Sequence, residues 1–395
     1  MQISFGKNLT EKNNQMENIE KLNNVLKHIK DCFIGKDEII DLMGISLIAR
    51  ENAFLLGPPG TAKSAIVRAL SACISDGKNF EYLLTRFTEP GELFGPFDIR
   101  KLKEGELVTN TEGMMPEASM VFLDEIFNAN SAILNSLLTA LNERIFRRGK
   151  ETKVLPALMF IGASNVLPED ESLNALLDRF LIRVRCDYVD TDLLEQVLVA
   201  GWNLDSKNRN ENRNENPSVT PAEIIALQQL SKQVDLSPIR KQYVDLIHNL
   251  RNTGIKVSDR RAVKIQNLLA ASAVMSNRKE VITSDLWVLK HVWDTEEQIE
   301  ILEGIVNSII EKDMSPLAHP QAQNNKTPNA EELIKEIIQL KDKWELGKLS
   351  FEEQNVVKDK LRYLQTRSNW IKNSEHKLHI HEQIESLWHK ILQTI

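Results

Sequence analysis

Short apolar runs alternate with longer helical patterns between residues 19 and 187. The runs have four or five residues each, as buried strands do, and the chain between them is long enough for helices. Since parallel strands need such crossover connections, the alternation predicts an α/β fold built on a parallel sheet. The predicted strands are residues 53–56, 80–84, 120–123, 157–161 and 181–184.

The rest of the chain is helical in pattern, with two polar interruptions. One is rich in Asn, Glu and Arg without an apolar period, and the other contains several Pro and Asn. Both are predicted as linkers, and the polar N-terminus as a frayed segment. Trp287 and Trp293 are predicted to anchor the core of the helical part between the linkers. The predicted division is 1–18 (frayed), 19–202 (α/β core), 203–218 (linker), 219–314 (helical domain), 315–330 (linker) and 331–395 (helical segment).

Composition narrows the class of protein. The formal net charge is −7, from 49 Lys and Arg against 56 Asp and Glu, which argues against a protein that coats nucleic acid. No apolar stretch is long enough to span a bilayer, and the first residues lack the apolar region of a signal peptide. The three cysteines lie far apart with no C-x-x-C pair, as in reduced proteins. These features predict a cytoplasmic protein without a membrane span.

The first predicted strand runs into GPPGTAKS (57–64), which approaches the phosphate-loop pattern G-x-x-x-x-G-K-[ST]. In such a loop, backbone N–H groups at a helix N-terminus surround the phosphates. Lys63 would contact the β- and γ-phosphates, and Ser64 would bind Mg²⁺. Ala62 replaces the usual Gly, at a cost of about 1 kcal/mol if its φ is positive and near zero if it is helical. The alternative is a Gly/Pro turn that caps an ordinary helix.

A second motif, VFLDE (121–125), is a buried-type strand that ends in two carboxylates. We expect Asp124 to hold the metal and Glu125 to deprotonate a water molecule as the catalytic base. The alternative is a strand that runs into an acidic turn, but the order and spacing of the two motifs favour a nucleotide site. After the fourth predicted strand, Asn165 could hold the attacking water, although Asn is common in such turns.

Together, GPPGTAKS, VFLDE, GASN (162–165) and LDRF (177–180) resemble the AAA+ ATPases of the MoxR family. TRFTEPGELFGP (85–96), LTALNER (138–144) and VSDRR (257–261) are most similar to its RavA, or regulatory ATPase variant, branch. The resemblance covers roughly residues 19–310. It implies a P-loop AAA+ core, a five-stranded parallel sheet with helices on both faces, followed by an all-helical lid and a helical C-terminal segment. Alanine before the loop lysine is common in this group.

The resemblance also implies roles for single residues. Asn165 matches sensor 1, and Arg179 matches the arginine finger that reaches a neighbouring subunit, with an ion pair to Asp178 as the alternative. Arg260 matches sensor 2, with Arg261 as the competing assignment. The segment that packs near adenine matches FIGK (33–36). The residues expected at the nucleotide are Gly57, Pro58, Pro59, Gly60, Thr61, Ala62, Lys63, Ser64, Ala65, Ile34 and Gly35.

Two predicted hairpins, 97–110 and 145–150, match loops that line a pore or contact a client in related rings; the alternative is a solvated turn. The RavA branch carries a small β-rich unit that docks an inducible lysine decarboxylase, but residues 331–395 look helical and are too short for it. A von Willebrand factor A-type partner is implied by kinship alone. His376, His379 and His381 could include a metal pair, but a solvated helix face is favoured.

The predicted function is an ATPase that uses ATP/ADP and Mg²⁺ and assembles as a homo-oligomeric ring, a hexamer by resemblance. It would remodel a protein client or insert a metal cofactor. The main alternative is a ring motor that acts on nucleic acid or in a restriction complex, against which the acidic charge balance argues. A monomeric kinase would need no Arg179 in trans, and a scaffold with negligible turnover would have no need of Glu125.

Overall fold

The computed structural model describes residues 2–148, 151–168, 170–209, 216–311, 313, 315–323, 330–345, 351–368 and 374–393. Its centre is a five-stranded parallel sheet with the order β2-β3-β6-β1-β7. The predicted parallel sheet is confirmed, and every strand end lies within three residues of the predicted one. The strands are β1 (Ala53–Leu56), β2 (Asn79–Leu83), β3 (Met120–Asp124), β6 (Met159–Ser164) and β7 (Ile182–Arg185).

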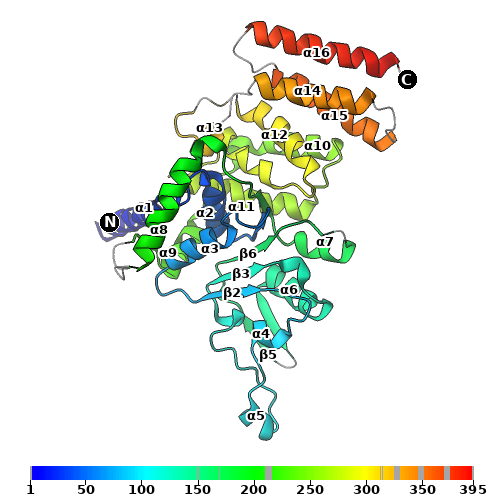
Figure 1. Ribbon diagram of the computed structural model, residues 1–395. Coiled ribbons are helices and arrows are strands. Elements are labelled where there is room, and N and C mark those ends of the chain that lie inside the picture. The colour runs from blue at the N-terminus through cyan, green and yellow to red at the C-terminus, as the bar shows by residue number, and fades with distance from the viewer. Residues whose placement is uncertain are drawn as a thin grey trace.

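Helices cover both sides of this sheet (Figure 1). All four residues of β1 are buried between β6 and β7, which explains why this interior strand reads as a continuous apolar run rather than an alternating one. The helices of the core are α1 (Gln2–Cys32), α2 (Asp37–Ala49), α3 (Lys63–Ala72), α6 (Ser131–Glu143), α7 (Glu171–Leu177) and α8 (Leu194–Arg209), with short helices η1 (Met115–Glu117), η2 (Ile126–Asn128) and η3 (Thr191–Leu193).

Two insertions extend from one end of the core (Figure 1). The hairpin predicted over 145–150 is present but extends to residue 154: β4 (Ile145–Arg148) pairs antiparallel with β5 (Glu151–Val154), and residues 149–150 between them lie outside the described residues. The hairpin predicted over 97–110 is present only as antiparallel pairing at its base, and a short helix occupies its first arm. That insertion follows α4 (Pro90–Phe94) and carries helix α5 (Ile99–Lys103), because Asp98 accepts hydrogen bonds from two backbone N–H groups and caps it. A single β-bridge, between Phe97 and Thr109, closes its base.

The lid that follows is helical, as predicted. Trp287 and Trp293 are both buried, which confirms them as core residues. Its elements are α9 (Pro221–Ser231), η5 (Ser237–Ile239), α10 (Arg240–Asn252), α11 (Asp259–Met275), η6 (Thr283–His291) and α12 (Glu297–Ile310).

The C-terminal part follows α13 (Pro320–Gln323) and consists of α14 (Ala330–Glu345), α15 (Phe351–Ser368) and α16 (Ser374–Gln393). These three helices pack together around a hydrophobic cluster of their own, and α15 contacts α12 of the lid. Ile384, Leu387 and Ile391 are buried in that cluster, so the amphipathic face of α16 serves internal packing.

Three predicted boundaries differ from the structure. Residues 2–18 are helical rather than frayed, because the buried second half of α1 nucleates a helix that extends toward the N-terminus at little cost. Residues 203–209 continue α8 and are not part of a linker. Of the rest of the predicted linker 203–218, residues 210–215 lie outside the described residues and residues 216–218 are not helical. Residues 320–323 form α13 within the second predicted linker.

Candidate active site

The phosphate-type loop connects β1 to α3, and its conformation answers the question raised by Ala62. Ala62 has φ 67° and ψ 17°, the left-handed region, so its Cβ costs on the order of 1 kcal/mol. Gly57 is a glycine for a steric reason, since a Cβ there would lie 2.2 Å from the carbonyl oxygen of Cys186. Thr61 Oγ1 donates to the Pro58 carbonyl at 2.9 Å, which fixes the loop internally. The alanine is strained, but the loop geometry is kept.

Replacing Ala62 by glycine is expected to change little. Relief of about 1 kcal/mol in the folded state is opposed by about 0.4–1 kcal/mol from the greater freedom of glycine in the unfolded chain. We expect the free energy of unfolding to change by less than about 0.5 kcal/mol, and nucleotide affinity to change by at most a few-fold. Thermal melts and nucleotide titrations would test this. A tenfold gain in affinity would show that the alanine distorts the loop.

Lys63 and Ser64 meet the predicted acidic and amide residues. The buried Lys63 ammonium donates to the carbonyls of Gly57 and Pro58, the latter at 2.9 Å, and to Asn165 Oδ1 at 3.1 Å. Ser64 Oγ donates to Asp124 Oδ2 at 3.1 Å. The structure therefore brings the phosphate-type loop, the end of β3 and the end of β6 together at the carboxyl edge of the sheet.

Glu125 directly follows β3 in a left-handed conformation, with φ 51°. Its Oε1 accepts a hydrogen bond from the Asn165 amide, whose carbonyl faces Lys63. Burial and the neighbouring charge of Asp124 raise the pKa of the Glu125 carboxyl above its ordinary value, while Lys63 and Asn165 oppose the shift. A carboxylate with a raised pKa and a fixed orientation is suited to accept a proton.

The segment expected near adenine lies beside the phosphate-type loop. Gly35 has φ +74°, and a Cβ there would lie 3.2 Å from side-chain carbons of Val189 and Leu193. Lys36, which follows it, donates through Nζ to the Asp187 carbonyl. Tyr188 then donates to the Pro59 carbonyl at 3.2 Å. Ile34 and Gly35 thus border a segment that also touches the loop.

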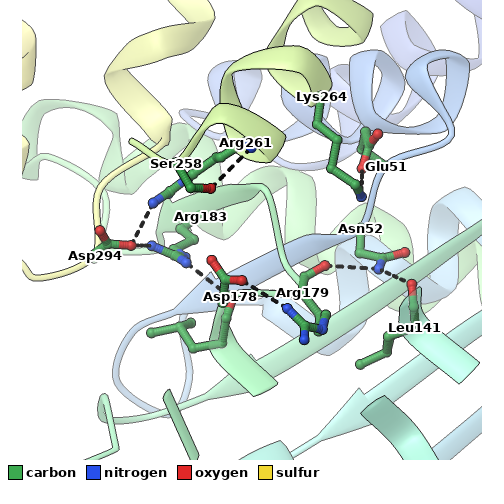
Figure 2. A network of polar contacts seen from close by, with 11 residues as sticks. Glu51, Asn52, Leu141, Asp178, Arg179, Arg183, Ser258, Arg261, Lys264 and Asp294 are labelled. Carbon is green, nitrogen blue, oxygen red and sulfur yellow. Dashed lines mark hydrogen bonds and ion pairs between the residues drawn. The ribbon is translucent and has the colours of Figure 1, made fainter. Parts of the chain in front are cut away.

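Arg179 lies at the opposite edge of the sheet. It precedes β7, and its carbonyl accepts from Asn52 Nδ2 at 3.0 Å, directly before β1 (Figure 2). Lys63 follows the other end of β1. The Arg179 guanidinium pairs with Asp178 at 2.8 Å, so the alternative considered for it, an ion pair, is present.

The two candidate sensor arginines have different surroundings. Arg261 is buried, pairs with Asp294 at 2.7 Å and donates to the Val292 carbonyl. Arg260 is exposed and lines a small hollow together with Arg179 and Lys264. Lys264 in turn pairs with Glu51 at 2.7 Å, which fixes α11 beside the start of β1 (Figure 2). Arg260 therefore lies on the side of Arg179, away from Lys63.

The described residues contain no group of three or more His, Cys, Asp or Glu side chains arranged to hold a metal ion. His379 is exposed and His381 lies 3.4 Å from Ser368 Oγ, whereas the side chain of His376 lies outside the described residues. Across the same part of the chain, no helix combines the length and apolar character needed to cross a membrane.

This strand order, with a phosphate-type loop after β1 and paired carboxylates at the end of β3, defines a P-loop nucleotide-binding protein. Residues 20–229 match the family model described as "MoxR domain in the MoxR-vWA-beta-propeller ternary systems", and residues 235–306 match an AAA lid domain. The chain belongs to the MoxR family of AAA+ ATPases.

Relatives and a solved structure are consistent with this assignment. An uncharacterized protein of Methanocaldococcus jannaschii is 35% identical over 300 residues, which is 75% of this chain and 76% of that protein. Chaperone MoxR1 of Mycobacterium tuberculosis is 25% identical over 175 residues, 43% of this chain and 45% of that one. The crystal structure of a candidate ATPase from Cytophaga hutchinsonii shares the fold, with a TM-score of 0.62, 18% identity and coverage of 78% of this chain and 98% of that chain.

Proposed function

We propose that the protein hydrolyses ATP with Mg²⁺ at sites shared between neighbouring subunits of a homo-oligomeric ring, a hexamer by family resemblance. The observation that carries this proposal is the separation of its two sets of residues. Lys63, Ser64, Asp124, Glu125 and Asn165 meet at the carboxyl edge of the sheet, and Arg179 and Arg260 share a hollow at the amino edge.

Each residue of the first set has a chemical task. The Lys63 ammonium exchanges the loop carbonyls for phosphate oxygens, and the backbone N–H groups of residues 60–65 surround the phosphates at the start of α3. Ser64 and Asp124 offer the hard oxygen ligands that Mg²⁺ prefers, and they already lie 3.1 Å apart. Bound Mg²⁺ would neutralise charge on the phosphate oxygens. Glu125 accepts the proton of the attacking water, which Asn165 helps to orient.

A neighbouring subunit must provide the arginines. The four residues of β1, at roughly 3.3 Å each, place about 13 Å between the two edges of the sheet. Arg179 therefore cannot stabilise the γ-phosphate beside Lys63 of its own chain, but in a ring it faces the next subunit. Arg260, in the same hollow, would act in trans beside it. This arrangement favours the ring over a monomeric kinase.

The family model supports a protein partner with a von Willebrand factor A domain, since its description places MoxR domains in ternary systems with such proteins. We propose that ATP turnover remodels a protein client in such an assembly in the cytosol; insertion of a metal cofactor is one form of that task. Ile99, Leu102 and Leu107 expose apolar side chains around α5 and are candidates for contacting the client. The resemblance to the RavA branch stays a prediction.

The pH dependence of hydrolysis should reflect Glu125. Because the pKa of its carboxyl is raised, activity is expected to fall on acidification at a pH above the ordinary titration range of glutamate. Asn165 donates to the charged carboxylate and so lowers this pKa. Asn165→Ala should therefore move the acid limb of the kcat profile to higher pH as well as reduce kcat. A limb that stays in place would contradict the assignment of Glu125 as the base.

The proposed function is tested by measuring phosphate release per subunit against protein concentration. Assembly in trans requires the specific rate to rise with concentration and then level off. Glu125→Gln and Arg179→Ala proteins should each be inactive alone and regain part of the activity when mixed, because each contributes the half-site that the other lacks. A rate independent of concentration, with no recovery on mixing, would refute the shared site.

A further inference from the structure

A cluster of two buried arginines and one partly exposed aspartate joins the α/β core to the lid, close to Arg179 and Arg260, the two arginines proposed to act in trans. Arg183 of β7 and Arg261 of α11 both donate to Oδ1 of Asp294, which lies between η6 and α12 (Figure 2). The side chains of Arg183 and Arg261 are 1% and 6% exposed. The carboxylate is therefore shared by one arginine from the core and one from the lid.

Each arginine of this cluster is connected to one of the two arginines proposed to act in trans, Arg179 or Arg260. Arg183 donates through its second guanidinium nitrogen to the Leu177 carbonyl at 3.2 Å, and Leu177 directly precedes Asp178 and Arg179. Arg261 follows Arg260 in the chain, and its backbone N–H donates to Ser258 Oγ at the start of α11. Two short connections therefore lead from Asp294, one to the core segment with Arg179 and one to the lid turn with Arg260.

The negative charge of Asp294 is needed to hold the two arginines side by side. Burial, together with repulsion from Arg261, lowers the pKa of Arg183 to about 10. Burial alone would raise the pKa of Asp294, but attraction to Arg261 and Arg183 outweighs it and lowers the pKa instead. Asp294 thus stays ionised and holds two neighbouring cations together. Without its charge, the guanidinium groups repel each other, and the core and lid segments that carry them separate.

We propose that Asp294 is a positioning residue that holds Arg179 and Arg260 at a fixed distance from each other, so that both reach the same nucleotide of the neighbouring subunit. This inference rests on the proposed function. Asp294 contacts neither the phosphate-type loop nor the carboxylates at the end of β3, so its replacement affects the half-site given to a neighbour and spares the half-site of its own chain.

The test uses two variants of Asp294 in the full chain. Asp294→Asn removes the charge, and Asp294→Glu keeps the charge, so that the fold is preserved, but moves the carboxylate by one methylene. Misplacement of catalytic groups by about 1 Å costs up to about 100-fold in rate. We expect both variants to lower kcat by about 10- to 100-fold while the affinity for a fluorescent ATP analogue changes less than about twofold.

Mixing experiments separate positioning from general damage. Each Asp294 variant should regain activity when mixed with Glu125→Gln, whose arginines are intact, and should not regain it with Arg179→Ala, which is defective on the same side. The control is Asp285→Asn, a buried carboxylate of the lid, which pairs with Arg278 at 2.6 Å and accepts from Ser272 in the last turns of α11, far along that helix from Arg260. Thermal melting gives the fraction of this variant that is folded, and kcat calculated per folded molecule should be normal.

The opposite pattern, with recovery by Arg179→Ala and none by Glu125→Gln, would overturn the inference, as would a normal kcat in the folded Asp294→Glu protein. If Glu125→Gln and Arg179→Ala do not complement each other in the reference mixture, the proposed function itself fails. The two failures are therefore distinguishable.

Discussion

Replacing Arg179 by alanine is expected to lower kcat for ATP hydrolysis by about 10³-fold or more. The guanidinium lies at the amino edge of the sheet, away from its own Lys63, and its only strong charge partner among the described residues is the exposed Asp178 at 2.8 Å. In the proposed ring it would give its delocalised charge to a γ-phosphate on another subunit. Phosphate release at saturating ATP measures the effect.

The matched control is Arg147→Ala, which removes an arginine from another surface ion pair, with Glu143 at 3.2 Å, and should leave kcat within about twofold. Arg179→Lys should not restore the rate, because an ammonium lacks the planar fork that contacts two oxygens. ATP affinity should be nearly unchanged in Arg179→Ala, since the residues proposed to hold the nucleotide lie at the other edge of the sheet. A normal kcat in Arg179→Ala would contradict the shared site and favour the monomeric kinase instead.

Much of the core could be predicted because β1, β3 and β6 are buried on both faces and each motif sits at a strand end, whereas the edge strand β2 alternates between exposed and buried residues. β1 is apolar throughout, so its position was evident, and the carboxylates after β3 were placed by the same reasoning. The conformation of Ala62 could not be predicted. The sequence allows either a helical or a left-handed alanine, and only the folded loop shows that the left-handed one is adopted.

The residues missed by sequence reasoning depend on contacts between distant segments. Tyr188 reaches the phosphate-type loop from the loop after β7, and a single tyrosine in a loop gives no signal of that role. Arg183 did give a signal in the sequence, since a buried arginine within an apolar strand requires a charged or hydrogen-bonding partner. That partner, Asp294, is 111 positions away, and neither the spacing nor the periodicity of the sequence connects the two.

Replacing Glu125 by glutamine is expected to lower kcat by about 10²- to 10⁴-fold, the usual contribution of a general base. Glutamine has the same shape, and its Oε1 can still accept from Asn165, so the orientation of the side chain and the backbone at φ 51° are kept. Only the ability to take a proton is lost. Hydrolysis should therefore collapse while nucleotide binding persists.

The neighbouring carboxylate provides the comparison that identifies the role of Glu125. Asp124 contacts Ser64 at 3.1 Å, so Asp124→Asn should weaken Mg²⁺ binding, and high Mg²⁺ should recover part of its activity. The rate of Glu125→Gln should not respond to Mg²⁺, because a missing base is not replaced by a metal. Titration of both variants with Mg²⁺ at saturating ATP measures this difference. If Glu125→Gln kept more than about one tenth of the kcat, another residue would have to be the base, and the raised pKa of Glu125, caused by burial and the charge of Asp124, would have no catalytic role.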